Sequence, residues 1–167
     1  MSLFSPCGPT WQQIKQSGVC SPSSFLRLRS FASSNSAEPR ASGPQGCGQI
    51  LSGEVVTDRR SRFQAHIARV NSVDHVESIV TQIRARKDMK KATHQMVAYR
   101  LSNGVSARDD GGEGGAGDRI LSLLERMNQT DIVAIVTRWY GGVPLGGDRF
   151  RIITSVVKKL IESKKIE

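Results

Sequence analysis

Cysteine is absent from the chain after Cys47, and the three cysteines present, Cys7, Cys20 and Cys47, all precede Gly48. The part after Gly48 therefore has neither an internal disulfide framework nor a thiolate site for zinc or an iron–sulfur cluster. Long apolar runs are also missing, because the longest, Ile132 to Val136, is far shorter than the roughly 18 residues that cross a membrane. We therefore expect no membrane partner.

Acidic residues are scarce as well. The chain has 15 Asp and Glu against 24 Lys and Arg, which gives a formal net charge of +9. A basic excess of this size favours an acidic partner such as RNA or the ribosome. The alternative is that the charge is solvated and only keeps the protein in solution.

Residues 1–48 differ in composition from the rest, with 11 Ser, four basic residues and one acid, Glu38. We predict a disordered leader here, because no element with a continuous apolar face can be drawn. A segment rich in Arg and Ser and poor in acid is typical of a mitochondrial transit peptide, and Arg29 to Ser33 predicts cleavage after Phe31. The alternative is a tail without a targeting signal. The predicted location is therefore the mitochondrial matrix or the cytoplasm.

From Gly48 onward, short strands alternate with amphipathic helices, which predicts a single α/β (α+β) domain over residues 49–167. The expected strands cover 50–57, 62–70, 92–101, 105–108 and 131–137, and the expected helices cover 73–86, 116–127 and a last segment with Asp148 as its N-cap. Residues 131–137 are apolar on both faces, so this strand is expected to be central. The strand at 105–108 is expected at an edge.

Two glycine-rich junctions connect predicted strands to predicted helices. The first, 109–115, carries Asp109, Asp110 and Glu113, which would repel a phosphate. These carboxylates are suited to three roles: holding a cation, capping the next helix, or facing a basic partner.

The second junction follows the strand at 131–137. It places three arginines beside two aromatic residues, a combination typical of surfaces that bind nucleic-acid phosphates and stack on bases. These residues are Arg138, Trp139, Tyr140, Arg149 and Arg151. Alternatively, Trp139 and Tyr140 end the strand and cover the edge of the core. The junction is not a Walker A loop, so nucleotide hydrolysis has no support.

The three histidines, His66, His75 and His94, share no metal-ligand spacing, and we expect neither a metal nor a cofactor. His94 lies on the strand predicted at 92–101, from which it can approach Asp109 or Asp110 as an acid–base pair. The alternative is a structural, hydrogen-bonded histidine. The sequence contains no serine or cysteine nucleophile motif.

Four segments of the chain match one family in the right order. They are Ser61–His66, Ala92–Arg100, Asp109–Gly117 and Arg138–Phe150. Together they resemble the IMPACT (YigZ-like) family, and the last segment is closer to the eukaryotic IMPACT form. The resemblance implies a fold like the second domain of ribosomal protein S5, a two-layer sandwich of one sheet with helices packed on one face.

The resemblance also implies a translation-linked regulator. Eukaryotic relatives bind the co-activator of the amino-acid-starvation kinase that phosphorylates initiation factor 2, and they associate with ribosomes and actin. Those relatives carry an N-terminal RWD domain, and here the predicted leader stands in its place.

We therefore expect a non-enzymatic domain that binds the ribosome, RNA or a translation-regulatory protein. The expected binding surface comprises Arg138, Trp139, Tyr140, Arg149, Arg151, Lys87, Lys90 and Lys91. The alternative is a small-molecule enzyme that uses His94 with Asp109 and Asp110 in a cleft between the two glycine-rich loops.

Overall fold

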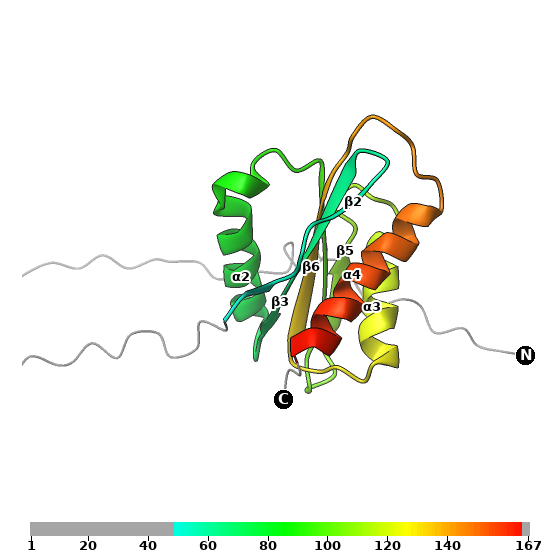
Figure 1. Cartoon of the computed structure of the whole chain (residues 1–167). Coiled ribbons are helices and arrows are strands. Elements are labelled where there is room, and N and C mark those ends of the chain that lie inside the picture. The colour runs from blue at the N-terminus through cyan, green and yellow to red at the C-terminus, as the bar shows by residue number, and fades with distance from the viewer. Residues whose placement is uncertain (1–48, 165–167) are drawn as a thin grey trace, which may run out of the picture.

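The computed structural model describes residues 49–164 (Figure 1). The predicted leader, with its cleavage position after Phe31 and all three cysteines, lies outside the described residues. Within the described part of the chain, no helix is long and apolar enough to cross a membrane.

One antiparallel sheet of six strands forms the centre of the domain. Its strands are β1 (Leu51–Ser52), β2 (Val56–Asp58), β3 (Ser61–Arg69), β4 (His94–Arg100), β5 (Ser106–Asp109) and β6 (Ile132–Trp139). The strand order is β1-β3-β6-β4-β5, and β2 also pairs with β3. The central position of β6 and the edge position of β5 confirm what the two segments predict.

The described residues also form three α-helices and one short 3-10 helix. They are α2 (Val73–Ala85), η1 (Lys87–Met89), α3 (Ala116–Arg126) and α4 (Asp148–Lys164). Figure 1 shows α2 on one side of the sheet and α3 with α4 on the other. The mixed class and the single sheet are confirmed, but the expectation of helices on one face is wrong.

The central strand explains why both faces are covered. Ala134 and Val136 of β6 belong to the core beneath α3 and α4, whereas Val133 and Ile135 belong to the core beneath α2. Because successive side chains of a strand point to opposite faces, a strand that is apolar on both needs a helix on each. The apolar run in β6 therefore dictates three layers.

The strand predicted at 50–57 is divided in two. β1 and β2 both pair with β3, but the chain between them leaves the ladder at Gly53 to Val55. Gly53 keeps two bonds to β3, because its N–H donates to Ala65 O at 2.8 Å and its carbonyl accepts from Gln64 Nε2 at 3.0 Å. The interruption is a local bulge in an edge strand.

The candidate residues gather at one end of the sheet, the upper end in Figure 1. There the end of β6 pairs with the start of β4, and Arg138 lies opposite His94. The β2–β3 turn at Arg59 and Arg60 reaches the same end and contacts Gly141, where an added Cβ would lie 2.1 Å from the Arg60 carbonyl oxygen. Both glycine-rich loops therefore close over this end.

The start of α4 is attached to the same turn. Asp148, the predicted N-cap, is the first residue of α4, and its carboxylate accepts a hydrogen bond from Arg59 Nη2 at 2.5 Å. This exposed ion pair also lowers the pKa of Asp148 and raises that of Arg59. Asp148 therefore connects α4 to the β2–β3 turn.

Candidate functional site

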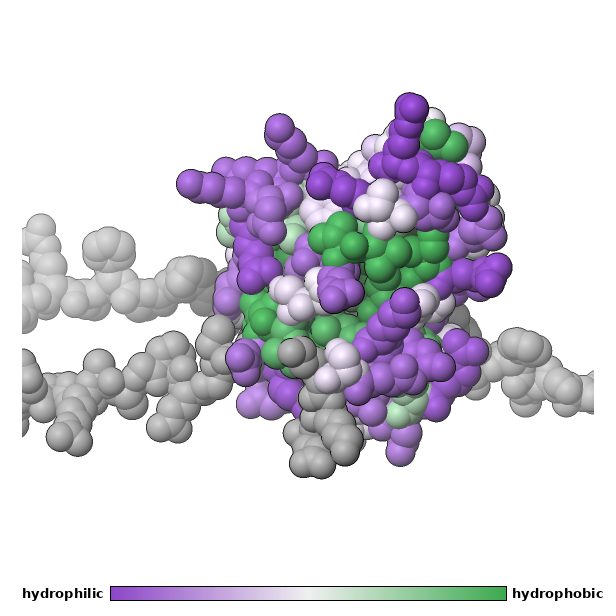
Figure 2. All heavy atoms as spheres, in the orientation of Figure 1, coloured by the Kyte–Doolittle hydropathy of each residue, from purple (hydrophilic) through white to green (hydrophobic). Residues whose placement is uncertain are grey.

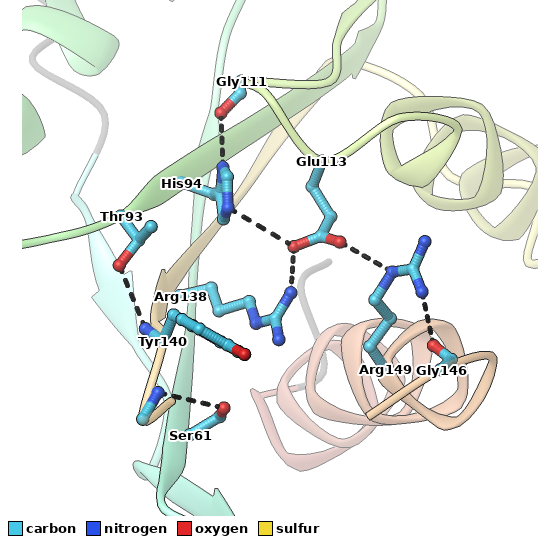
Figure 3. A network of polar contacts seen from close by, with 10 residues as sticks. Ser61, Thr93, His94, Gly111, Glu113, Arg138, Tyr140, Gly146 and Arg149 are labelled. Carbon is cyan, nitrogen blue, oxygen red and sulfur yellow. Dashed lines mark hydrogen bonds and ion pairs between the residues drawn. The ribbon is translucent and has the colours of Figure 1, made fainter. Parts of the chain in front are cut away.

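Glu113 lies at the centre of a polar network at the loop end of the sheet (Figure 3). Its side chain is 7% exposed. One carboxylate oxygen, Oε2, pairs with Nη1 of Arg138 and lies 3.8 Å from Nε2 of His94. The other, Oε1, lies 2.6 Å from Nε of Arg149. One carboxylate therefore balances only one of the two guanidinium charges, and the network keeps a net positive charge.

Two glycines bring the loop close enough to β4 for Glu113 to point inward. Gly111 has a φ of +54° and lies so near Gln95 that a Cβ would come within 2.0 Å of the Gln95 carbonyl oxygen. Gly112 has a φ of +89°, and its Cβ would lie 2.9 Å from Nδ1 of His94. The glycines of this loop thus serve a close backbone approach.

His94 is held by the loop that covers it. Its Nδ1–H donates to the carbonyl of Gly111 at 3.2 Å, which directs Nε2 toward Glu113. The predicted acid–base pair of His94 with Asp109 or Asp110 does not form within residues 49–164, because the ring makes its contacts with Gly111 and Glu113. His94 thus has the hydrogen bond that one of the two interpretations of the sequence expects.

The two aspartates of the loop have local partners. Asp110 accepts hydrogen bonds from the backbone N–H groups of Gly115 at 3.0 Å and Gly117 at 2.7 Å, at the start of α3. Asp109 accepts from the N–H of Gly111 at 3.0 Å and lies 3.8 Å from Arg84. Of the three roles that the sequence leaves open for this loop, capping is the one that Asp110 performs.

Arg138 is held inside the domain, away from the surface. Its guanidinium lies between two aromatic rings, 5.4 Å from the centroid of Phe63 and 5.2 Å from that of Tyr140. The side chain is 6% exposed. Arg138 is buried and paired with Glu113, so it does not present a charge to a phosphate at the surface. The sequence, by contrast, places it on the expected binding surface.

Tyr140 covers Arg138 and is itself open to solvent. The residue is 46% exposed, and its backbone N–H donates to Oγ1 of Thr93 at 3.0 Å. That bond fixes Tyr140 beside the start of β4. Trp139, its neighbour, is half-buried against the α2 side of the core and stacks with Arg62 at 5.2 Å. Trp139 therefore covers the core edge, whereas Tyr140 offers an exposed ring.

The two remaining arginines of the expected surface, Arg149 and Arg151, lie in different places. Arg149 pairs with Glu113, donates to Gly146 O at 2.5 Å and stacks on Phe150 at 4.2 Å. Arg151 lies instead in a groove of about 470 Å³ between β2 and α4. Figure 2 shows hydrophobic atoms exposed between these two elements. Arg151 is thus not part of the polar network.

The three lysines of the expected surface lie on the connection between α2 and β4. Lys87, Lys90 and Lys91 are exposed, and none has an ion-pair partner among the described residues. Lys90 lines a pocket of about 300 Å³ together with His94 and Thr93. Since Thr93 also binds Tyr140, the structure brings the lysine loop and the exposed tyrosine together.

Sequence reasoning missed the part played by Glu113. It treated the residue as one of three carboxylates that would repel phosphate. The only sequence feature that could have indicated a buried Glu113 is the glycines on both sides of it. The described residues contain no group of three or more His, Cys, Asp or Glu placed to hold a metal ion.

The fold and this end of the sheet define a mixed α/β domain with a buried carboxylate–arginine network beneath an exposed aromatic and basic surface. Residues 59–161 match the Impact N-terminal domain family. The chain belongs to this family, as the resemblance in its four sequence segments predicts.

Individual relatives agree with this assignment. The chain is 40% identical over 116 residues to the Protein IMPACT homolog of Dictyostelium discoideum, covering 67% of this chain and 34% of that protein. It is 37% identical over 119 residues to the Protein IMPACT homolog of Caenorhabditis elegans, covering 67% and 46%. The chain thus spans less than half the length of these relatives.

The chain is also similar to two solved structures. A crystal structure described only as that of a hypothetical protein matches with a TM-score of 0.62 and 27% identity, over 68% of this chain and 57% of the other. A structure of Yih1, described as a two-domain translational regulator, matches with a TM-score of 0.49 and 28% identity, over 83% and 55%.

Proposed function

We propose that this protein is a translational regulator that acts by binding the ribosome or RNA, with no chemistry of its own. Membership of the Impact N-terminal domain family supports the link to translation, through what the family resemblance implies. The observation that carries the binding role is that Thr93, which accepts a hydrogen bond from the backbone N–H of the exposed Tyr140, lines a pocket with Lys90 of the lysine loop.

The charge distribution supports this interpretation. Residues 84–91 contain five basic side chains and one acid, Asp88. A basic segment beside an exposed aromatic ring attracts phosphates and provides a face on which a base can stack. Arg138 contributes from below, because its cation–π contact holds Tyr140 in place.

The contributions of the lysines and of the tyrosine to RNA binding can be measured separately, because only the lysine contribution depends on salt. The full chain would be sedimented with ribosomes and titrated with a fluorescent single-stranded RNA at several salt concentrations. The double variant Lys90→Gln, Lys91→Gln should reduce the slope of log affinity against log salt by about 1 to 2. Tyr140→Ala should weaken binding by about 1 to 3 kcal/mol while leaving that slope unchanged.

The same experiment decides against the proposal if binding is absent or does not depend on salt. Lys158→Gln is the matched control, since Lys158 lies on α4 and pairs there with Glu162. A partner can also be co-purified with the chain from cells. If that partner is retained after nuclease treatment and needs neither Tyr140 nor the lysines, the partner is a protein and not RNA.

The compartment in which this binding occurs depends on residues 1–48. Fused to a fluorescent protein, this segment alone should direct it to mitochondria if it is a transit peptide, and should leave it in the cytoplasm otherwise. Loss of import after replacing Arg27 and Arg29 by Gln would identify the basic residues as the signal.

A further inference from the structure

A small pocket opens between the end of α2, the start of β4 and the glycine-rich loop before α3. Its volume is about 300 Å³, at the lower end of the range for ligand sites. The lining residues are Arg84, Met89, Lys90, Ala92, Thr93, His94, Gln95 and Gly111. The pocket adjoins the surface of Tyr140 and the lysine loop, and it shares Thr93 and Lys90 with that surface.

The lining of this pocket is rich in hydrogen-bond donors of positive or neutral charge. Arg84 contributes a guanidinium and Lys90 an ammonium group, which are both donors only. Thr93 and Gln95 add a hydroxyl and an amide. No carboxylate is among the residues that line it. An acidic ligand is therefore the chemistry that the pocket fits.

Two carboxylates lie just outside the pocket, and they offset its positive charge only in part. Asp109 is 3.8 Å from Nη2 of Arg84, a separation too long for a direct hydrogen bond. Glu113 is 3.8 Å from Nε2 of His94, but it is already paired with two arginines. Lys90 has no ion-pair partner among residues 49–164.

The donors come from three separate segments, which matters for the shape of the ligand. Arg84 is on α2, Lys90 follows η1, and Thr93 directly precedes β4. A carboxylate presents two oxygens in one plane, whereas a phosphate presents three or four in a tetrahedron and carries up to two charges. Donors from three separate segments favour the tetrahedral anion.

The pocket is also preorganised. The N–H of Gly111 donates to Asp109, and its carbonyl fixes the His94 ring. Figure 3 shows His94 between Gly111 and Glu113, and Thr93 near the backbone of Tyr140. A ligand therefore needs to order only the side chains of Arg84 and Lys90, which limits the entropic cost of binding.

We propose that this pocket is a binding site for a phosphate group, held by Arg84, Lys90 and the hydroxyl of Thr93. The phosphate belongs either to a small phosphorylated molecule or to the terminal phosphate of a nucleic acid. The proposal does not depend on ribosome binding, although Lys90 belongs to both sites, because the binding of a single phosphate group is measured without the ribosome.

The site is testable on the full chain by NMR. Inorganic phosphate, titrated at constant ionic strength against chloride, should shift the amide signals of residues 89–95 and 111 and the ring signals of His94. The shifts should saturate with a Kd of about 1 mM, appropriate to one charged group with a few hydrogen bonds. Lys90→Gln and Arg84→Gln should each weaken binding about tenfold, whereas Lys158→Gln should not change it.

Two further arms assign the source of the phosphate. A uridine hexanucleotide with a 5′-phosphate should bind about tenfold more tightly than the same chain with a 5′-hydroxyl if the ligand is a nucleic-acid end. Equal affinities, with phosphoserine bound as well as inorganic phosphate, assign the site to small phosphorylated molecules. Either result supports the pocket if Lys90→Gln weakens it.

Three outcomes would overturn the proposal. The first is shifts that grow without saturation or spread over the whole basic surface. The second is equal binding of acetate and phosphate, because a planar monoanion would then satisfy the site. The third is phosphate binding that is unaffected in both Lys90→Gln and Arg84→Gln. Ribosome binding that survives any of these leaves the proposed function intact.

Discussion

Glu113 and Arg138 lie 25 positions apart in the chain, and Arg138 donates a hydrogen bond to Glu113 where neither side chain is more than 7% exposed. The pair fastens the glycine-rich loop before α3 to the end of the central strand. Because a buried charge is costly without its partner, the pair and the loop conformation depend on each other.

Glu113→Ala should therefore lower the free energy of unfolding by about 3 kcal/mol or more, since it leaves the Arg138 guanidinium buried without a counter-charge. Urea denaturation followed by circular dichroism measures this change. The control is Glu162→Gln, which breaks an exposed ion pair with Lys158 on α4 and should cost less than about 0.5 kcal/mol. Equal losses in the two variants would show that Glu113 does not act as a buried counter-charge.

Gly111→Ala should destabilise the domain much more than Gly104→Ala. Both glycines have a positive φ, +54° and +85°, so both variants incur the cost of a left-handed backbone, about 1 kcal/mol. Only at Gly111 would the new Cβ also meet backbone, 2.0 Å from Gln95 O, while the space around Gly104 is open. We expect an additional loss of at least about 2 kcal/mol from thermal or urea unfolding. A difference near zero would mean that the loop moves away freely.

The sequence predicts those features of the fold that are encoded within one segment. Five consecutive apolar residues from Ile132 to Val136 identify the central strand, and the spacing of apolar residues identifies each helix. The sequence also predicts that the apolar faces of the helices pack against a sheet. The same run in β6 shows that both faces of the central strand are apolar. This pattern already indicates helices on both faces of the sheet, in contrast to the expectation of helices on one face.

The site could be predicted only in part, because its contacts join distant segments. Gly111 approaches Gln95 and Gly141 approaches Arg60 through backbone geometry that no local pattern records. The partner of Arg138 is therefore not deducible from the residues around it. The same holds for Tyr140, whose backbone partner Thr93 lies 47 positions away in the chain.

The β2–β3 turn offers a stabilising substitution. Arg59 and Arg60 have φ values of +43° and +66°, the left-handed conformation that two-residue hairpin turns require and that Asn-Gly adopts most easily. Arg60→Gly should raise the free energy of unfolding by about 1 kcal/mol, measured by urea denaturation. Asn128→Gly is the matched control, because Asn already tolerates a φ of +50° and should gain only a few tenths. Destabilisation by Arg60→Gly would indicate that the arginine side chain supports the turn.

His66 should make the stability of the domain depend on pH. The ring is fully buried, and burial lowers its pKa to about 4 from the ordinary 6.5. Its Nδ1 contacts Oγ of Ser52 at 2.9 Å. Between pH 6.5 and 4 the unfolded chain binds a proton at this position and the folded chain does not, so stability falls as pH falls through that interval.

The full interval corresponds to about 3 kcal/mol, since one pKa unit equals about 1.4 kcal/mol. Urea unfolding of the wild type at pH 7, 6, 5 and 4 should show this decline as a progressive loss of free energy. His66→Gln removes the titrating ring while keeping a polar group beside Ser52, and it should flatten the profile whatever its effect at pH 7. His75→Gln, on α2, should leave the decline in place. A wild-type profile as flat as that of His66→Gln would show that His66 is not held neutral in the fold.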